Sequence, residues 1–122
     1  MPLPEATPAR VQGYLSGFSA TLAVNQVLAS LVAPAPAQAR VVRARAGVAG
    51  TSGSTVIDLV RNGTSMFTIP ANRPTLPFGS VGNFQSTPPN SVAVQAGDLL
   101  QLVVAATAGH QQVTATAALE QP

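Results

Sequence analysis

The feature that most constrains this fold is an Asn-Gly step, Asn62-Gly63, between two runs rich in apolar and β-branched residues. The run before it reads TVIDLVR (55–61) and the run after it reads TSMFTI (64–69). A two-residue type I′ turn needs positive φ at both central residues, and Asn-Gly is among the pairs that adopt it most readily. The step therefore predicts a β-hairpin whose strands are these two runs.

Short β segments separated by glycine and proline continue the same pattern along most of the chain. Segments predicted as strands are 10–19, 25–33, 38–50, 55–61, 64–69, 91–94, 99–106 and 112–120. The stretches 47–54 and 70–90 are predicted loops, and 95–98 and 107–110 are predicted turns. Residues 25–33 also fit a helical spacing of apolar residues, so two interpretations stay open there. Short strands with turn signals every 8–12 residues or so indicate an all-β, antiparallel β-sandwich.

The N-terminus is predicted to differ from the rest of the chain. Three prolines in MPLPEATPA (1–9) predict an extended arm, ahead of a single β-sandwich domain over residues 10–122. The chain is 46% hydrophobic but only 4% aromatic, so Ala and Val must supply much of the core. Small side chains each bury little area, which favours an oligomer or a large partner surface. No apolar run approaches the ~18 residues of a membrane span, so no membrane partner is expected.

The inventory of reactive side chains argues against catalysis. The chain has no cysteine, one histidine and four acidic residues, too few for a triad or a metal site of usual composition. We therefore expect no enzyme, no cofactor and no metal. His110 is expected to be a solvent-exposed turn residue. Asp98 is expected to shape its turn, its carboxylate accepting from nearby backbone N–H groups. Asp58 is expected beside Arg43 or Arg45.

Charge is sparse, and the arginines are its main feature. The net charge is +2, and only Arg40, Arg43 and Arg45 lie close together in sequence. Their alternation with small residues predicts that Arg43 and Arg45 share one face of a strand. This face has three interpretations: a solvated surface, ion pairs to an acidic partner, or contact with phosphates. Because a nucleic-acid surface usually combines dense basic residues with aromatics, no direct nucleic-acid partner is expected.

The order of several short motifs resembles a β-sandwich module of tailed-bacteriophage virion proteins. The stretch from Ala39 to Ser80, then VQAGDLLQLVV and VTATAALE, carries the pattern over about two thirds of the chain. Matching residues are Gly50, Gly53, Asp58, Asn62, Gly63, Ser65, Phe67, Arg73, Pro74, Thr75, Ala96, Gly97, Asp98 and Leu100. The resemblance implies a jelly-roll-like fold and a structural role in the virion, with modules of this kind found in capsid decoration (cement) proteins and in fibres.

A single module with an arm suits a stand-alone decoration protein on the outer surface of the capsid. The expected partners are the major capsid protein and further copies of the chain, most simply a trimer at local three-fold sites. Expected contact residues are Leu3, Pro4 and Glu5 in the arm, the Arg43/Arg45 face, and Phe78 and Phe84, which would pack inward to order the outer loop or a subunit interface.

The alternative is a head-fibre, tail-fibre or baseplate module that recognises glycans on the host surface. Its support in the sequence is limited to Tyr14 and the polar stretch around Asn72 and Arg73.

Overall fold

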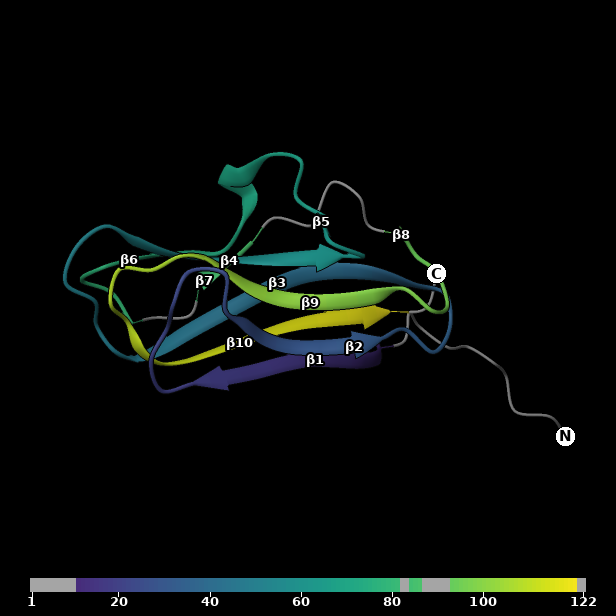
Figure 1. Cartoon of the computed structure of the whole chain (residues 1–122), viewed down its shortest axis with the longest axis horizontal. Helices are drawn as coiled ribbons and strands as arrows, with labels where there is room; N and C mark the ends of the chain where they lie inside the picture. Colours follow the sequence, from purple (N-terminus) through teal and green to yellow (C-terminus); the bar gives the residue numbers. More distant parts are fainter. Residues whose placement is uncertain (1–10, 82–83, 87–92, 121–122) are drawn as a thin grey trace, which may run out of the picture.

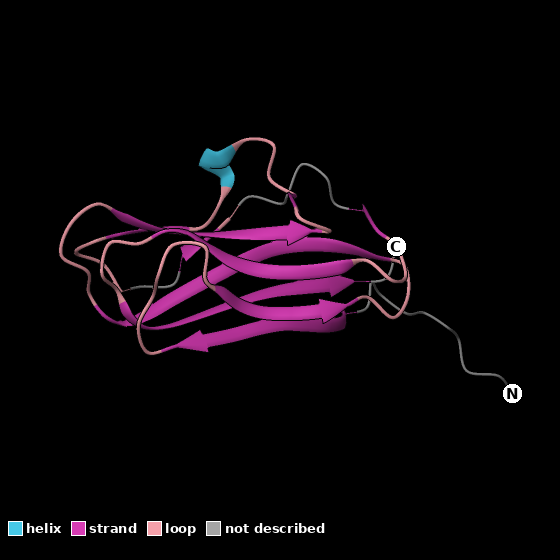
Figure 2. Cartoon of the chain, in the orientation of Figure 1, coloured by secondary structure: helices cyan, strands magenta, loops and turns pink. Residues whose placement is uncertain are grey.

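Two antiparallel sheets pack face to face in this computed structural model, which describes residues 11–81, 84–86 and 93–120 (Figures 1 and 2). The strands are β1 (Val11–Ser19), β2 (Val27–Val32), β3 (Ala37–Val48), β4 (Ser54–Arg61), β5 (Thr64–Ser65), β6 (Thr75–Pro77), β7 (Phe84–Gln85), β8 (Ala93–Val94), β9 (Leu99–Ala106) and β10 (Gln111–Glu120). One short 3₁₀ helix, η1 (Pro70–Asn72), projects from the loop that follows β5.

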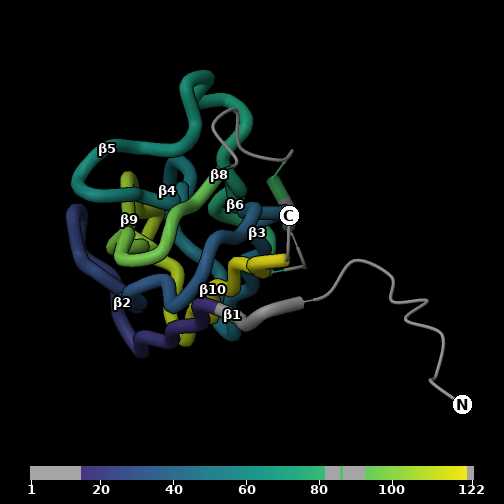
Figure 3. Tube along the Cα trace, turned by 90° about the vertical axis from the view of Figure 1, so that its right-hand side faces the viewer, coloured from purple at the N-terminus to yellow at the C-terminus, as the bar shows by residue number. Residues whose placement is uncertain are grey.

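The strand order identifies the connectivity. Sheet A has the order β1-β10-β3-β7, and sheet B has the order β2-β9-β4-β5. Two short strands lie outside these orders. β8 pairs with β3, as β7 does, and β6 pairs with β4, as β5 does. The chain therefore passes repeatedly between the sheets, whose two layers separate when the molecule is viewed along its length (Figure 3). This is the arrangement of a double-sheet jelly roll, so the prediction of a jelly-roll-like antiparallel β-sandwich is confirmed.

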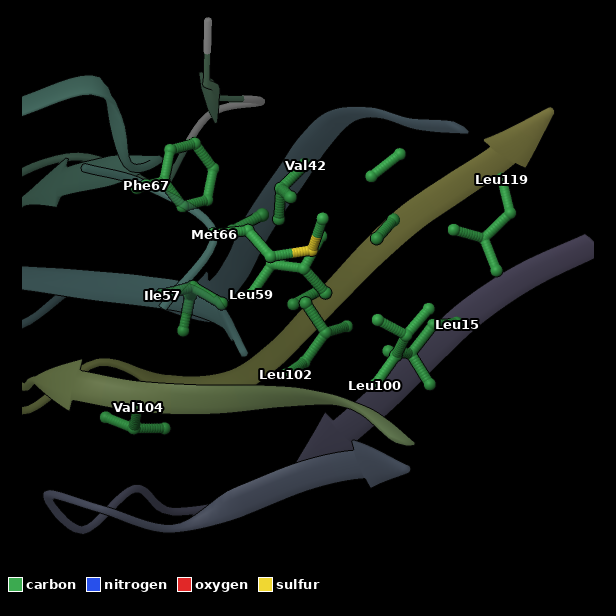
Figure 4. Packing of buried hydrophobic residues seen from close by; sticks show 14 of the residues in the cluster. Leu15, Val42, Ile57, Leu59, Met66, Phe67, Leu100, Leu102, Val104 and Leu119 are labelled. Carbon is green, nitrogen blue, oxygen red and sulfur yellow. The ribbon is translucent and has the colours of Figure 1, made fainter. Parts of the chain in front are cut away.

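The core lies between the sheets and is built from unequal contributions. Sheet A supplies mostly small side chains, and sheet B supplies large ones (Figure 4). The buried residues of β3 and β10 include Ala39, Val42, Ala44, Ala46, Val113, Ala115 and Ala117, and those of β4 and β9 include Ile57, Leu59, Leu100, Leu102 and Val104. Facing large residues with small ones lets the two layers interdigitate at native density.

The Asn-Gly hairpin forms as predicted. Asn62 has φ 52° and Gly63 has φ 85°, the two positive values that a type I′ turn requires. The returning strand is shorter than predicted, since β5 ends at Ser65. The Met66 N–H still donates to the Leu59 carbonyl of β4 at 2.8 Å, and Met66 and Phe67 are buried in the core, which explains why the apolar run continues past the strand.

The second interpretation of residues 25–33 is wrong, because residues 27–32 form strand β2. It pairs with β9 through Leu31 opposite Leu100 and Val32 opposite Leu99. β2 lies at the edge of sheet B, and every one of its residues retains some solvent exposure. An edge strand buries only part of its apolar set, which blurs the period-two signal in the sequence.

The predicted loop at 70–90 is partly structured, since it contains η1, β6 and β7. Phe78 does not pack inward as expected, because its side chain is 49% exposed, and its role at a subunit interface stays a prediction. The cause is a turn in which the Ser80 N–H donates to the Pro77 carbonyl at 3.0 Å, which ends β6 and directs Phe78 outward. Phe84 pairs with Ala44 through the backbone, but its side chain falls outside the described structure, as do Leu3, Pro4 and Glu5.

Candidate interaction surface

The outer face of sheet A carries Arg43 and Arg45. On β3, Val42 and Ala44 point into the core, while the two arginines between and beyond them are exposed. Two residues along a strand advance about 6.6 Å, so both guanidinium groups start from neighbouring positions on one flat surface. This confirms the prediction that they share a face. It also places them on the sheet that does not contain Asp58.

Threonines of the neighbouring strand complete this surface. Thr116 lies opposite Arg43, and Thr114 lies opposite Arg45, across the β3–β10 pairing. These residues, with Ala44, line a shallow hollow of about 330 Å³. We call Arg43, Arg45, Thr114 and Thr116 the arginine face. The threonines were not predicted, because their place beside the arginines depends on the register of strands far apart in the chain.

Other described arginines have partners within the fold. Arg40 pairs with Glu120 at 3.1 Å between Nε and Oε2. Arg61 donates from Nη1 to the Ala93 carbonyl. Within the described residues, the side chains of Arg43 and Arg45 make neither an ion pair nor a hydrogen bond. The arginine face therefore presents donors without an internal acceptor.

A second polar group lies on the outer side of sheet B, around Asp58. Its Oδ1 accepts from the Ser65 hydroxyl at 2.7 Å, and its Oδ2 lies 3.4 Å from Nη2 of Arg73. The expected pairing of Asp58 with Arg43 or Arg45 is thus wrong. β4 and β3 belong to different sheets, and the loop after β5 brings Arg73 to the carboxylate instead.

Burial governs the protonation of Asp58. Desolvation raises the pKa of this carboxyl above its ordinary value of 3.8, although the Ser65 hydroxyl, the Arg73 charge and a backbone N–H all act to lower it. The single long contact to Arg73 does not offset the desolvation, and Arg73 Nε is itself buried with no hydrogen-bond partner in the described structure. A raised folded pKa means that Asp58 favours the folded state most at low pH, and that this contribution is lost as the pH rises through the folded value.

A third group joins the turn at 95–98 to the Asn-Gly hairpin, at the right-hand end of Figure 1. Asp98 accepts from the Gln95 N–H at 2.9 Å and from the Asn62 amide at 3.0 Å. The Asn62 amide oxygen accepts from the Leu99 N–H at 2.9 Å. These contacts lower the pKa of Asp98 below 3.8, with the Gln95 N–H as the largest cause. The predicted role of Asp98 is confirmed, and we call these four residues the aspartate clasp.

A fourth group surrounds His110, at the β9–β10 turn on the left of Figure 1. The prediction of a solvent-exposed histidine is wrong, because His110 is only 1% exposed. Its Nε2 lies 2.8 Å from the Ser80 carbonyl, and its Nδ1 lies 2.7 Å from the Thr55 hydroxyl. A carbonyl can only accept, so Nε2 carries a proton. The Thr55 oxygen also accepts from the Ala108 N–H at 2.9 Å, and we call these four residues the histidine cluster.

Five of the fourteen motif residues of the resemblance belong to these groups. Asp58, Ser65 and Arg73 form one, and Asn62 and Asp98 belong to the aspartate clasp. Gly50 is required by close packing, since a Cβ there would lie 2.5 Å from the Ala108 carbonyl oxygen. These six motif residues therefore connect loops and turns with distant parts of the sandwich.

The titratable side chains of the described residues are spread over the fold. Histidine and the carboxylates lie in separate groups, and residues 11–81, 84–86 and 93–120 contain no set of three His, Asp or Glu placed to hold a metal ion. In the same part of the chain, no helix has the length and apolarity to cross a membrane.

Comparison with known proteins leaves the family open. The chain matches no family model, and no curated protein matches its sequence. The resemblance to virion modules stays a prediction that rests on the motif residues.

Proposed function

We propose that this chain is a structural virion protein, a capsid decoration (cement) protein that binds the outer surface of a phage capsid through the arginine face. The observation that carries the proposal is the contrast between Arg43 and Arg45, which have no partner in the described fold, and Arg40, Arg61 and Arg73, which have one. Exposed donors on a flat face suit an acidic surface on the major capsid protein.

The mechanism is multivalent. One such patch offers few contacts, and an exposed ion pair contributes little by itself. Contacts to adjacent capsomers act together when a copy engages more than one at a time, because the second binding event becomes intramolecular. The stiff sandwich supports this role, since its loops are fastened to the sheets by the aspartate clasp and the histidine cluster.

The fibre or tail alternative has weaker support. Arg73, which could have contacted a glycan, is engaged by Asp58 and is held at the edge of sheet B. Copy number separates the two functions. A decoration protein occurs in a simple ratio to the major capsid protein, whereas a fibre or tail component occurs in a few copies per virion.

The test is occupancy on expanded capsids that lack the protein. Replacing both arginines, Arg43→Ala with Arg45→Ala, should reduce occupancy at least tenfold, and added salt should weaken wild-type binding. Arg40→Ala is the matched control, because Arg40 lies on the same strand but is paired with Glu120. Undiminished occupancy of the double variant, or an equal loss in the control, would remove the arginine face from the binding surface.

A further inference from the structure

The two lateral edges of the sandwich are protected to different degrees. At the edge formed by β7 and β8 in sheet A and by β5 and β6 in sheet B, the strands are very short: β5, β7 and β8 have two residues each, and β6 has three. Pro77 ends β6, and η1 follows β5. Short strands and prolines are devices that prevent a sheet edge from pairing with another chain.

The opposite edge of sheet B is formed by β2, which is longer than these strands and contains no proline; a register shift interrupts its pairing with β9 between Val27 and Ala29, and the pairing is regular from Ala29 to Val32. β2 is six residues long, VLASLV, with no proline and no charge. It lies within a stretch, residues 11–39, that contains no charged residue. Val32 is 60% exposed and Val27 is 46% exposed. A short, uncharged segment rich in β-formers on an open edge is the type of strand that pairs with another strand.

The register shows which backbone groups of β2 point outward. The Ala33 N–H donates to the Asp98 carbonyl at 2.8 Å, so Ala33 faces β9. The Leu99 carbonyl, opposite Val32, accepts instead from the Asn62 N–H on the other side of β9. Since inward and outward groups alternate along an antiparallel strand, Leu31 faces β9, and Ser30 and Val32 present their N–H and C=O groups away from the sheet.

We propose that β2 pairs antiparallel with β2 of a second copy of this chain. The two five-stranded B sheets would then join across a two-fold axis into one continuous sheet. A second copy suits this edge because the segment is neutral and offers no charge for a different partner to complement. When the two-fold axis passes between the two Leu31 residues, Ser30 of each copy lies opposite Val32 of the other. The outward N–H and C=O groups of Ser30 and Val32 then hydrogen-bond to each other across the interface.

The decisive variant removes an outward N–H. Ser30→Pro deletes that donor, and proline is tolerated on an edge strand where the N–H faces solvent. The full-length wild-type chain should have the mass of a dimer by light scattering after size exclusion, and Ser30→Pro should have half that mass. Ser30→Ala is the matched control, because it loses only the weak side-chain contact to Gln101 and keeps the backbone donor. It should stay dimeric.

A second variant tests the same interface in case the Ser30→Pro protein does not fold. Val32→Lys places a charge on a side chain that is already exposed, and it brings like charges together across the two-fold axis. It should be folded by circular dichroism and monomeric, whereas Phe78→Lys, at a similarly exposed site away from β2, should remain dimeric.

Three results would overturn the proposal: a wild-type monomer at all concentrations, a Ser30→Pro protein that stays dimeric, or a trimer, which the family resemblance leads one to expect. A trimer needs a heterologous contact that β2–β2 pairing does not supply. The inference does not depend on the proposed function. Loss of capsid binding in the arginine variants with an intact dimer, or the reverse, would separate the two.

Discussion

The two ends of the sandwich are fastened by polar groups of opposite character. At one end, the histidine cluster is buried: His110 is 1% exposed, Thr55 is fully buried, and neither has a charged hydrogen-bond partner. At the other, the aspartate clasp is open to solvent and is built around a carboxylate. Both join a turn to a segment far away in sequence.

The two ends differ in whether water can replace a hydrogen bond that is lost. Water can reach the atoms of the aspartate clasp, so a broken hydrogen bond there is partly replaced. Water cannot easily reach the histidine cluster, and a group that loses its partner bears the full cost of desolvation. The buried end should therefore be the more sensitive to substitution, and the exposed end the more sensitive to pH.

The largest effect is expected for His110→Ala. The change removes a buried ring, leaves a cavity, and deprives the Thr55 hydroxyl and the Ser80 carbonyl of a partner. We expect the free energy of unfolding to fall by about 3 kcal/mol, as measured by equilibrium denaturation. Gln111→Ala, at the exposed next position, serves as the control and should change stability by less than about 0.5 kcal/mol. Equal effects of the two would contradict a buried, bonded His110.

Thr55→Val isolates the polar part of the same cluster. Valine keeps the shape of threonine but cannot accept from the Ala108 N–H or bond to His110 Nδ1. We expect a loss of about 2 kcal/mol, because two buried groups are left without a partner. The matched control is Thr114→Val on the exposed outer face of sheet A, expected within about 0.5 kcal/mol of wild type. A neutral Thr55→Val would show that the cluster contributes packing alone.

The contrast between the ends also explains what the sequence could predict. The Asn-Gly hairpin and the role of Asp98 follow from turn chemistry that involves neighbouring residues, and both predictions were confirmed. The same holds for the alternation that buries Val42 and exposes Arg43. These features are local, so the signal is carried in a few adjacent letters.

Two of the errors concern contacts between distant segments. TAGH reads as an exposed turn, and nothing near His110 in sequence indicates that Thr55 and Ser80 enclose it. Arg73 reaches Asp58 through the path of a loop that was predicted to lack structure, which is why the charge pair was assigned to the wrong arginines. The error at Phe78 has a local cause instead: the residue is apolar and was expected inside, but the turn at Pro77–Ser80 interrupts the strand and Phe78 is exposed.

At the exposed end, the Asn62 side chain is expected to have a moderate effect. Asn62→Ala removes the bonds to Asp98 and the Leu99 N–H and also puts alanine at φ 52°, a left-handed conformation that it disfavours. We expect a loss of about 1–2 kcal/mol by equilibrium denaturation. Asn62→Gly keeps the conformation and loses only the side-chain bonds, so it should cost less. Both variants lose the same hydrogen bonds, so a glycine variant that was no more stable than the alanine variant would show that the left-handed conformation at residue 62 is not what makes alanine unfavourable there.

The smallest effect, and the most specific to the exposed end, is the pH dependence removed by Asp98→Asn. Because the folded pKa of Asp98 lies below its ordinary value of 3.8, its contribution to stability is present above that value and is lost as the pH falls through the folded pKa. The variant should be slightly less stable than wild type at neutral pH, and the difference should shrink in acid. Asp58, whose pKa is shifted in the opposite direction, is common to both proteins and cancels in the comparison. Denaturation at a series of pH values measures the difference directly. A difference that stays constant down to the acid limit would mean that the carboxylate acts in the aspartate clasp only through its shape, and that charge does not distinguish the two ends.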